Sequence, residues 1–116
     1  MDIDIKGLQE LVVKFRDDRD WKQFHNPKDC ALSLVLESAE VLEHFQWKNG
    51  EDITKYIEKE KEAISHELAD VLYWVLLMSH DLDIDISEAF TKKIKLSGEK
   101  YPIEKARGKS DKYTKL

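Results

Sequence analysis

The sequence has little that would support a disulfide-bonded or membrane-bound protein. Its 116 residues include a single cysteine, Cys30, so no disulfide can form within the chain. No apolar run approaches the roughly 20 residues that a membrane span needs. The start, Met1-Asp2-Ile3-Asp4, lacks the basic and apolar segments of a signal peptide. We therefore expect a cytoplasmic protein without a membrane partner, in which Cys30 is a small core residue.

Acidic side chains outnumber basic ones, and they are unevenly distributed. The net charge is −5 overall, but residues 1–90 contain 10 basic and 21 acidic side chains, whereas residues 91–116 contain 9 and 3. The acidic part would repel a phosphate backbone, so we exclude nucleic acid as a partner. An acidic body with a basic end suits a metal ion held against a polyphosphate, but a solvated acidic bundle with a Lys-rich end has the same composition.

Apolar residues recur at helical spacing in the first half of the chain. The spacing from Leu8 to Phe15 predicts a first amphipathic helix. Asn26 is suited to cap a second helix and Pro27 to begin it, and the apolar face then continues until Asn49-Gly50. Between this helix and the next we expect a charged connection over residues 51–61, with at most a short helical piece.

Two further helices are predicted in the second half. The third should run over about 60–81, with Leu68 and Leu72 inside, and the fourth should begin at Asp85 and end near Gly98. No strand pattern of convincing length is present. The expected fold is an all-α, four-helix-type bundle. Four short helices leave little core for each chain, so we expect a homo-oligomer, either a dimer or a tetramer.

Paired carboxylates interrupt the two most apolar helices. Glu37 and Glu40 lie three residues apart in one helix, and Glu67 and Asp70 lie three apart in the next, so each pair shares a helix face. If the two helices form an antiparallel hairpin, the pairs converge and repel one another. A hard divalent cation relieves such repulsion, and the all-oxygen donor set favours Mg²⁺, or Mn²⁺, over zinc.

Carboxylates in this pattern also occur on solvated helix faces and in di-iron bundles. A single such pair is usually a solvated helix face, but two pairs embedded in apolar sequence favour a site. A di-iron bundle needs two Glu-x-x-His repeats, and this chain has none. His44 and His66 stand beside the acidic pairs and are either outer partners of the site or ordinary surface histidines.

The carboxylate pattern resembles a known family signature. Glu37-x-x-Glu40, followed after 26 residues by Glu67-x-x-Asp70, is similar to that of the all-α nucleoside triphosphate pyrophosphohydrolases, the MazG-like superfamily. Further segments resemble its dCTP pyrophosphatase branch over nearly the whole chain: Arg19-Asp20-Trp21 with Gln23-Phe24-His25, Phe45-Gln46-Trp47-Lys48, Lys100-Tyr101-Pro102, Ala106-Arg107-Gly108 and Lys112-Tyr113-Thr114.

The resemblance implies roles for particular residues. Glu37, Glu40, Glu67 and Asp70 would bind Mg²⁺, with Glu40 or Glu37 also acting on the attacking water. The implied substrate-binding residues are Trp21, Trp47, Tyr73, Trp74, Lys93, Ser97, Lys100, Arg107, Lys112 and Tyr113. Trp74 stands where the branch often has Tyr, and Ser97 where an Asn is common. Residues 1–102 would form the catalytic domain and residues 103–116 a basic tail that packs near the active site.

The implied activity is hydrolysis of a nucleoside triphosphate to its monophosphate and pyrophosphate. Mg²⁺ would neutralise phosphate charge and lower the pKa of a water that attacks the α-phosphorus. The expected substrate is dCTP or a 5-modified dCTP, and the purpose is nucleotide pool sanitation. Two alternatives stay open: a related pyrophosphohydrolase acting on another nucleotide, such as phosphoribosyl-ATP, and a non-catalytic helical interaction module.

Overall fold

The computed structural model describes residues 2–116, and all regular structure in that range is helical. This confirms the predicted all-α class. The elements in chain order are α1 (Ile5–Asp18), η1 (Lys22–Phe24), α2 (Pro27–Glu43), α3 (Glu51–Asp81), α4 (Ile86–Lys100), α5 (Ile103–Ala106) and η2 (Tyr113–Lys115). In the described part of the chain no helix has the length and apolar character needed to cross a bilayer.

Three helix starts are capped by side chains, which explains why the helices begin where they do. Asp4 accepts a hydrogen bond from the Gly7 backbone N–H at 2.7 Å at the start of α1. Asn26 accepts from the Asp29 N–H at 2.9 Å, with Pro27 as the first residue of α2, as the sequence predicted. The predicted cap of α4 is also confirmed, since Asp85 accepts from the Glu88 N–H at 3.1 Å.

The helix α3 consists of two helices merged across a kink, because Glu60 has non-helical backbone angles. The part after the kink ends at Asp81 and agrees with the helix predicted over about 60–81. The part before the kink begins at Glu51, so the charged connection expected over 51–61 is helical for more of its length than the short piece predicted there. Residues 51–59 are rich in Glu and Lys and contain neither Gly nor Pro, so they favour a helix although their apolar pattern is weak. The helix α4 ends at Lys100, close to the predicted end near Gly98.

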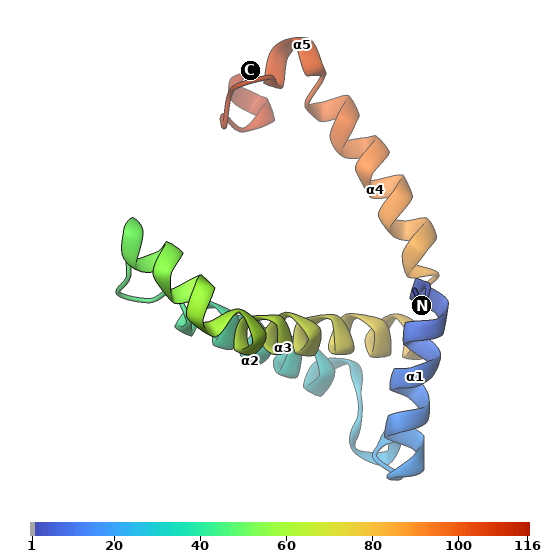
Figure 1. Ribbon diagram of the computed structural model, residues 1–116. Helices are drawn as coiled ribbons and strands as arrows, with labels where there is room; N and C mark the ends of the chain where they lie inside the picture. The colour runs from blue at the N-terminus through green and yellow to red at the C-terminus, as the bar shows by residue number, and fades with distance from the viewer. Residues whose placement is uncertain (1) are drawn as a thin grey trace. The chain divides into compact units, whose positions relative to one another are not determined.

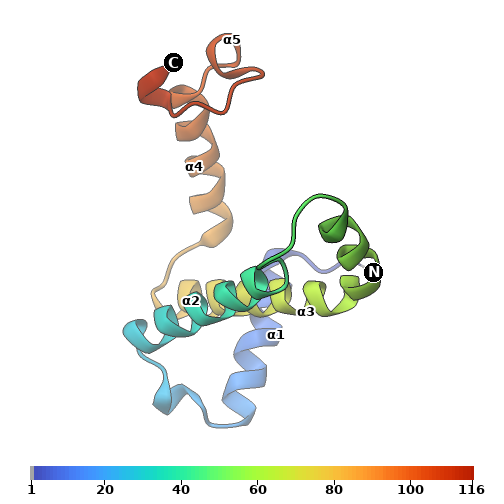
Figure 2. The same ribbon diagram turned by 90° about the vertical axis from the view of Figure 1, so that its left-hand side faces the viewer.

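The chain divides into two compact units, the first ending at Asp83 and the second comprising Ile84–Leu116, and each is described by itself. In the first unit, α2 lies antiparallel along α3, and α1 crosses the C-terminal part of α3 (Figures 1 and 2). The predicted α2–α3 hairpin is therefore confirmed. Gln9 fixes the α1 crossing, because its side-chain amide donates to the Leu76 carbonyl and to the Ser79 hydroxyl, both at 3.0 Å.

The core of the first unit is small. Leu76 and Leu77 of α3 and Cys30 of α2 are its fully buried apolar side chains among the described residues. Cys30 is 2% exposed, which confirms its predicted place in the core. By contrast, Leu68 and Leu72 were expected inside but are exposed in the single chain, because no helix of this unit covers that face of α3.

The second unit consists of α4, the short helix α5 and the final turn η2. Tyr101 and Tyr113 meet edge to face with ring centroids 5.9 Å apart, and the Lys100 Nζ lies 5.0 Å from the centre of the Tyr113 ring. These contacts hold η2 close to the C-terminal end of α4.

Candidate active site

The four predicted metal-binding carboxylates meet on the facing sides of α2 and α3. Glu37 and Glu40 come from α2, and Glu67 and Asp70 come from α3. One oxygen from each lies within 4.8 Å of the others. The convergence follows from the hairpin, because residues three apart share a face and the two helices run antiparallel.

The carboxylates are held in an environment that disfavours their charge. Burial, followed by hydrogen bonding to Glu40 and the neighbouring negative charges, raises the pKa of Glu37 to about 7. Hydrogen bonding to Glu40 and burial also raise the pKa of Glu67, against the opposing effect of His44. The first unit therefore concentrates negative charge that a cation would relieve.

Two oxygen atoms of the cluster have no partner in the protein. Glu37 Oε2 and Glu67 Oε2 are buried and accept no hydrogen bond from the residues described. Buried polar atoms without partners are costly, and coordination to a cation satisfies them. The chemistry of the donor set and the unsatisfied oxygens both fit a hard divalent cation.

An aromatic pocket adjoins two of the carboxylates. It has a volume of about 500 Å³ and is lined by Leu11, Val12, Phe15, Trp21, Glu37, Asp70, Tyr73 and Trp74. The structure thus brings three predicted substrate-binding aromatics together with two predicted metal ligands. The pocket therefore offers both aromatic surface and two carboxylates to a ligand that enters it.

Edge-to-face contacts order the aromatic walls. Phe15 meets Trp21 at 5.8 Å and Tyr73 at 6.2 Å between ring centroids, and Tyr73 meets Trp74 at 5.0 Å. The Arg19 guanidinium stacks on the Phe15 ring, with its Cζ atom 3.8 Å from the ring centroid. The sequence predicts only that Phe15 lies on an apolar helix face. Apart from its nearness to Arg19-Asp20-Trp21, nothing in the sequence indicates that it lines this pocket.

Trp47 lies outside this pocket. It follows α2 with a positive φ of 68° and is 90% exposed in the single chain. Its predicted contact with substrate stays a prediction.

The histidines beside the acidic pairs differ from each other. A ring nitrogen of His44 lies 2.6 Å from the Tyr56 hydroxyl, whereas His66 is exposed on α3. Of the two, His44 is the one that influences Glu67. A role for either histidine in contacting the metal-binding carboxylates stays a prediction.

The remaining predicted substrate-binding residues belong to the second unit. Lys93, Ser97 and Lys100 are on α4, at spacings that place them along one stripe. Arg107 follows α5, while Lys112 precedes η2 and Tyr113 begins it. Within this unit Lys100 and Tyr113 are brought together. The phosphate contacts expected of Lys93, Ser97 and Lys100 stay predictions, as does the closing of the other three residues over the site.

Comparisons with known proteins agree with this geometry. Residues 32–116 match the MazG-like family. The chain is 35% identical to human dCTP pyrophosphatase 1 and 33% identical to the mouse protein, in each case over 97% of this chain and 67% of the relative. A crystal structure of a pyrophosphatase from Archaeoglobus fulgidus is similar with a TM-score of 0.81 and 33% identity, over 88% of this chain and 95% of that one. The chain therefore belongs to the MazG-like family and, within it, to the dCTP pyrophosphatase branch, as its residue pattern predicted.

Proposed function

We propose that this protein hydrolyses dCTP, or a 5-modified dCTP, to the monophosphate and pyrophosphate with the help of Mg²⁺, and so removes surplus or non-standard nucleotides. The broader class, a hydrolase acting on nucleotide anhydrides, follows from family membership. The observation that carries the finer proposal is the position of Glu37 and Asp70, which belong both to the carboxylate cluster and to the wall of the aromatic pocket.

The aromatic pocket is the proposed site of the base. Its rings offer stacking surface for a planar heterocycle, and stacking is worth about 1–3 kcal/mol for each base. With the base held by Trp21 and Trp74, the triphosphate extends toward the carboxylates. This arrangement would bring the α-phosphorus, rather than the γ-phosphorus, near the cluster.

The four carboxylates are the proposed ligands of Mg²⁺, with Mn²⁺ as a substitute. When bound, this ion supplies positive charge that offsets the phosphate oxygens and makes a nearby water more acidic. Glu40, or Glu37, is proposed to orient that water and accept its proton.

The basic residues of the second unit are proposed to contact the leaving group. Lys93 and Lys100 carry positive charge that would offset the charge developing on pyrophosphate in the transition state. Ser97 can donate a hydroxyl hydrogen bond to the phosphates, and Arg107, Lys112 and Tyr113 would close over the site. In this proposal residues 1–102 form the catalytic domain and residues 103–116 the tail that packs against it.

We also propose that the protein acts as a homo-oligomer, a dimer or a tetramer. In support, α2 exposes Leu32, Val35, Leu36 and Leu42 in the single chain, and α3 exposes Leu68 and Leu72. Apolar faces of this extent are typical of interfaces. Size-exclusion chromatography with light scattering should show a mass above that of one 13.6 kDa chain; a monomer at all concentrations would contradict the proposal.

A panel of ribo- and deoxyribonucleoside triphosphates tests the substrate. Each nucleotide is incubated with the protein and Mg²⁺, and the products are separated by ion-exchange chromatography. We expect the highest kcat/KM for dCTP or a 5-modified dCTP. Cleavage of phosphoribosyl-ATP but of no pyrimidine nucleotide would replace the proposed substrate, and no cleavage at all would favour an interaction module.

A further inference from the structure

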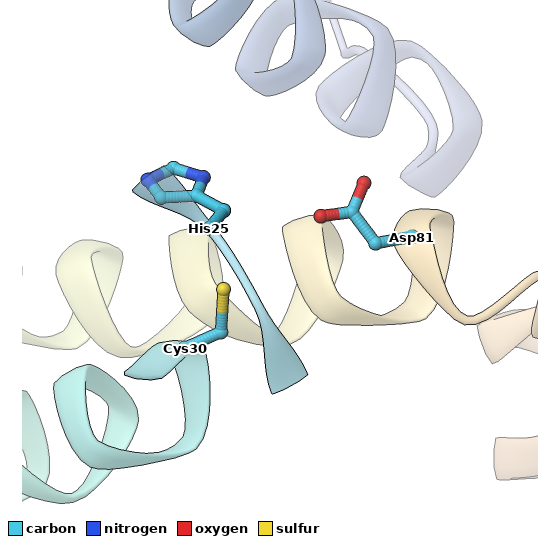
Figure 3. Close-up of side chains that lie close together, drawn as sticks. All are labelled: His25, Cys30 and Asp81. Carbon is cyan, nitrogen blue, oxygen red and sulfur yellow. The ribbon is translucent and has the colours of Figure 1, made fainter. Parts of the chain in front are cut away.

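A second group of metal-ligand side chains lies away from the carboxylates, where α2 begins and α3 ends. His25 precedes α2, Cys30 lies near its start, and Asp81 is the last residue of α3. One ligand atom from each lies within 4.8 Å of the other two. Figure 3 shows the three side chains converging from these separate segments. The proposed hydrolysis uses none of them.

The cluster contains buried groups that lack a protein partner. His25 Nδ1 is buried and makes no hydrogen bond with the residues described. Cys30 is a free thiol that is 2% exposed. An unsatisfied imidazole nitrogen beside a buried sulfur is costly in an empty site, and coordination to an ion through Nδ1 would remove that cost.

The cluster is also accessible. His25, Cys30 and Asp81 all line a pocket of about 410 Å³, whose walls include Lys22, Asn26, Met78 and His80. The three side chains therefore border a space large enough for an ion and a water. The Asp81 side chain, 26% exposed, lies on the more accessible side.

We propose that His25, Cys30 and Asp81 bind a zinc-like divalent cation. One nitrogen, one sulfur and one oxygen donor suit zinc, and a water from the pocket would supply the fourth ligand. On binding, the Cys30 thiol releases its proton to solvent, so that a thiolate and a carboxylate offset the charge of the ion. The sulfur and nitrogen donors distinguish this site from the all-oxygen cluster, which suits a harder ion.

The nearby Arg16 shares Asp81 with this site and also has a second anion, Asp17, beside it. Its Nη1 donates to both Asp81 oxygens, at 2.8 and 2.7 Å, while its Nε donates to Asp17 at 3.1 Å. Asp17 offsets the guanidinium charge, and the hydrogen bonds from Arg16 fix the orientation of the Asp81 carboxylate. Replacing Asp81 would disturb this partly buried pair, so the test relies on His25 and Cys30.

A bound ion would have a structural effect and an optical one. It would tie the segment before α2 to the end of α3, and so stabilise the first unit. His25 also meets Trp74 edge to face at 5.4 Å, so a paramagnetic ion at His25 should quench the fluorescence of Trp74.

Cobalt(II) is the probe for the site because its bonds to thiolate sulfur absorb in the near ultraviolet. Metal-free protein is titrated with cobalt(II), and the expected result is a thiolate charge-transfer band that saturates at one ion per chain. Since Cys30 is the only cysteine, the band identifies the sulfur ligand. Zinc should then abolish the band by displacement, and zinc alone, without nucleotide, should raise the melting temperature.

Variants of His25 and Cys30 distinguish cobalt binding by the whole cluster from cobalt binding by the thiol alone. Losing a residue that only hydrogen-bonds to a metal ligand lowers metal affinity by roughly 10–100-fold. Because His25 is proposed to bind the ion directly, His25→Gln should weaken cobalt binding at least tenfold. His66→Gln, an exposed histidine of α3, and Glu67→Gln in the carboxylate cluster should leave the band unchanged. Cys30→Ser should lose both the band and the zinc-dependent melting shift, with circular dichroism confirming its fold.

Either of two results would overturn the proposal. One is a wild-type protein that shows no thiolate band, and the other is a band unaffected by His25→Gln, since Cys30 would then bind without the cluster. Neither result depends on nucleotide hydrolysis.

Discussion

Arg16 of α1 and Asp81 of α3 form a partly buried ion pair that joins the first and third helices. The guanidinium Nη1 lies 2.8 and 2.7 Å from the two carboxylate oxygens, and the Arg16 side chain is 0% exposed. These hydrogen bonds hold the pKa of Asp81 below its usual range, although burial acts in the opposite direction. The pair fixes the angle at which α1, a wall of the aromatic pocket, crosses α3.

Removing one partner of this pair should be strongly destabilising. Asp81→Asn leaves the buried guanidinium with Asp17 alone, and we expect a loss of about 2–3 kcal/mol in the free energy of unfolding, below the value for fully buried pairs because Asp81 is partly exposed. The control is Asp18→Asn, which breaks the exposed Lys14–Asp18 pair and should cost less than about 1 kcal/mol. Urea denaturation measures both, and equal losses would contradict the structural role.

The stability of the metal-free protein should fall as the pH rises from about 5 to 7. The raised pKa values of Glu37 and Glu67 mean that the folded state binds more protons than the unfolded state in this range, so rising pH favours unfolding. The lowered pKa of His25 acts in the opposite direction. Comparing wild type with Glu37→Gln isolates the carboxylate effect, because His25 contributes to both proteins.

In this comparison the variant should have a shallower downward slope, since Glu67 remains, and it should be more stable than wild type at pH 8 without metal. Saturating Mg²⁺ should remove the advantage of the variant. Parallel stability curves for the two proteins would show that Glu37 titrates normally, contrary to this expectation.

Trp21 should contribute directly to nucleotide affinity. Trp21→Ala removes one wall of the aromatic pocket, and a loss of about 1–3 kcal/mol corresponds to an increase in KM of roughly 5- to 150-fold. Steady-state kinetics with dCTP measure this. Phe24→Ala, at an exposed aromatic outside the pocket, is the matched control and should leave KM unchanged; the same increase in both variants would show a general loss of structure.

Lys93 should matter for catalysis, whereas its neighbour Lys92 should not. Lys92 forms an exposed ion pair with Glu88 at 2.7 Å, while Lys93 lies on the proposed phosphate stripe of α4. Removing a group that stabilises charge in the transition state lowers kcat by about 10²–10³-fold. For Lys93→Ala we expect a decrease in kcat of about 10²-fold. Comparable activity of Lys92→Ala and Lys93→Ala would contradict the assigned role.

The sequence was sufficient to predict the all-α fold, the α2–α3 hairpin and the meeting of Glu37 with Asp70. These predictions rest on local spacing, which a helix converts directly into a face. The extent of the helix before the kink at Glu60 is underestimated from the sequence, because residues 51–59 are helical through propensity rather than an apolar pattern. Leu68 was placed inside because periodicity identifies an apolar face without showing what covers it.

The cluster of His25, Cys30 and Asp81 could not be predicted in the same way. His25 and Cys30 are separated from Asp81 by some fifty residues, and their meeting depends on how α2 lies along α3. Arg16 was likewise unremarkable in the sequence, since a charged residue within a helix is usually exposed. Both features arise from tertiary packing rather than from a local pattern.

The most direct test of the central claim is phosphorus NMR of dCTP incubated with Mg²⁺ and either wild-type protein or Glu40→Gln. Glu43→Gln, on α2 but outside the carboxylate cluster, is the matched control. We predict dCMP and pyrophosphate from wild type and Glu43→Gln, and a loss of activity by orders of magnitude in Glu40→Gln. Formation of dCDP and phosphate, or full activity of Glu40→Gln, would contradict attack at the α-phosphorus by the proposed carboxylate site.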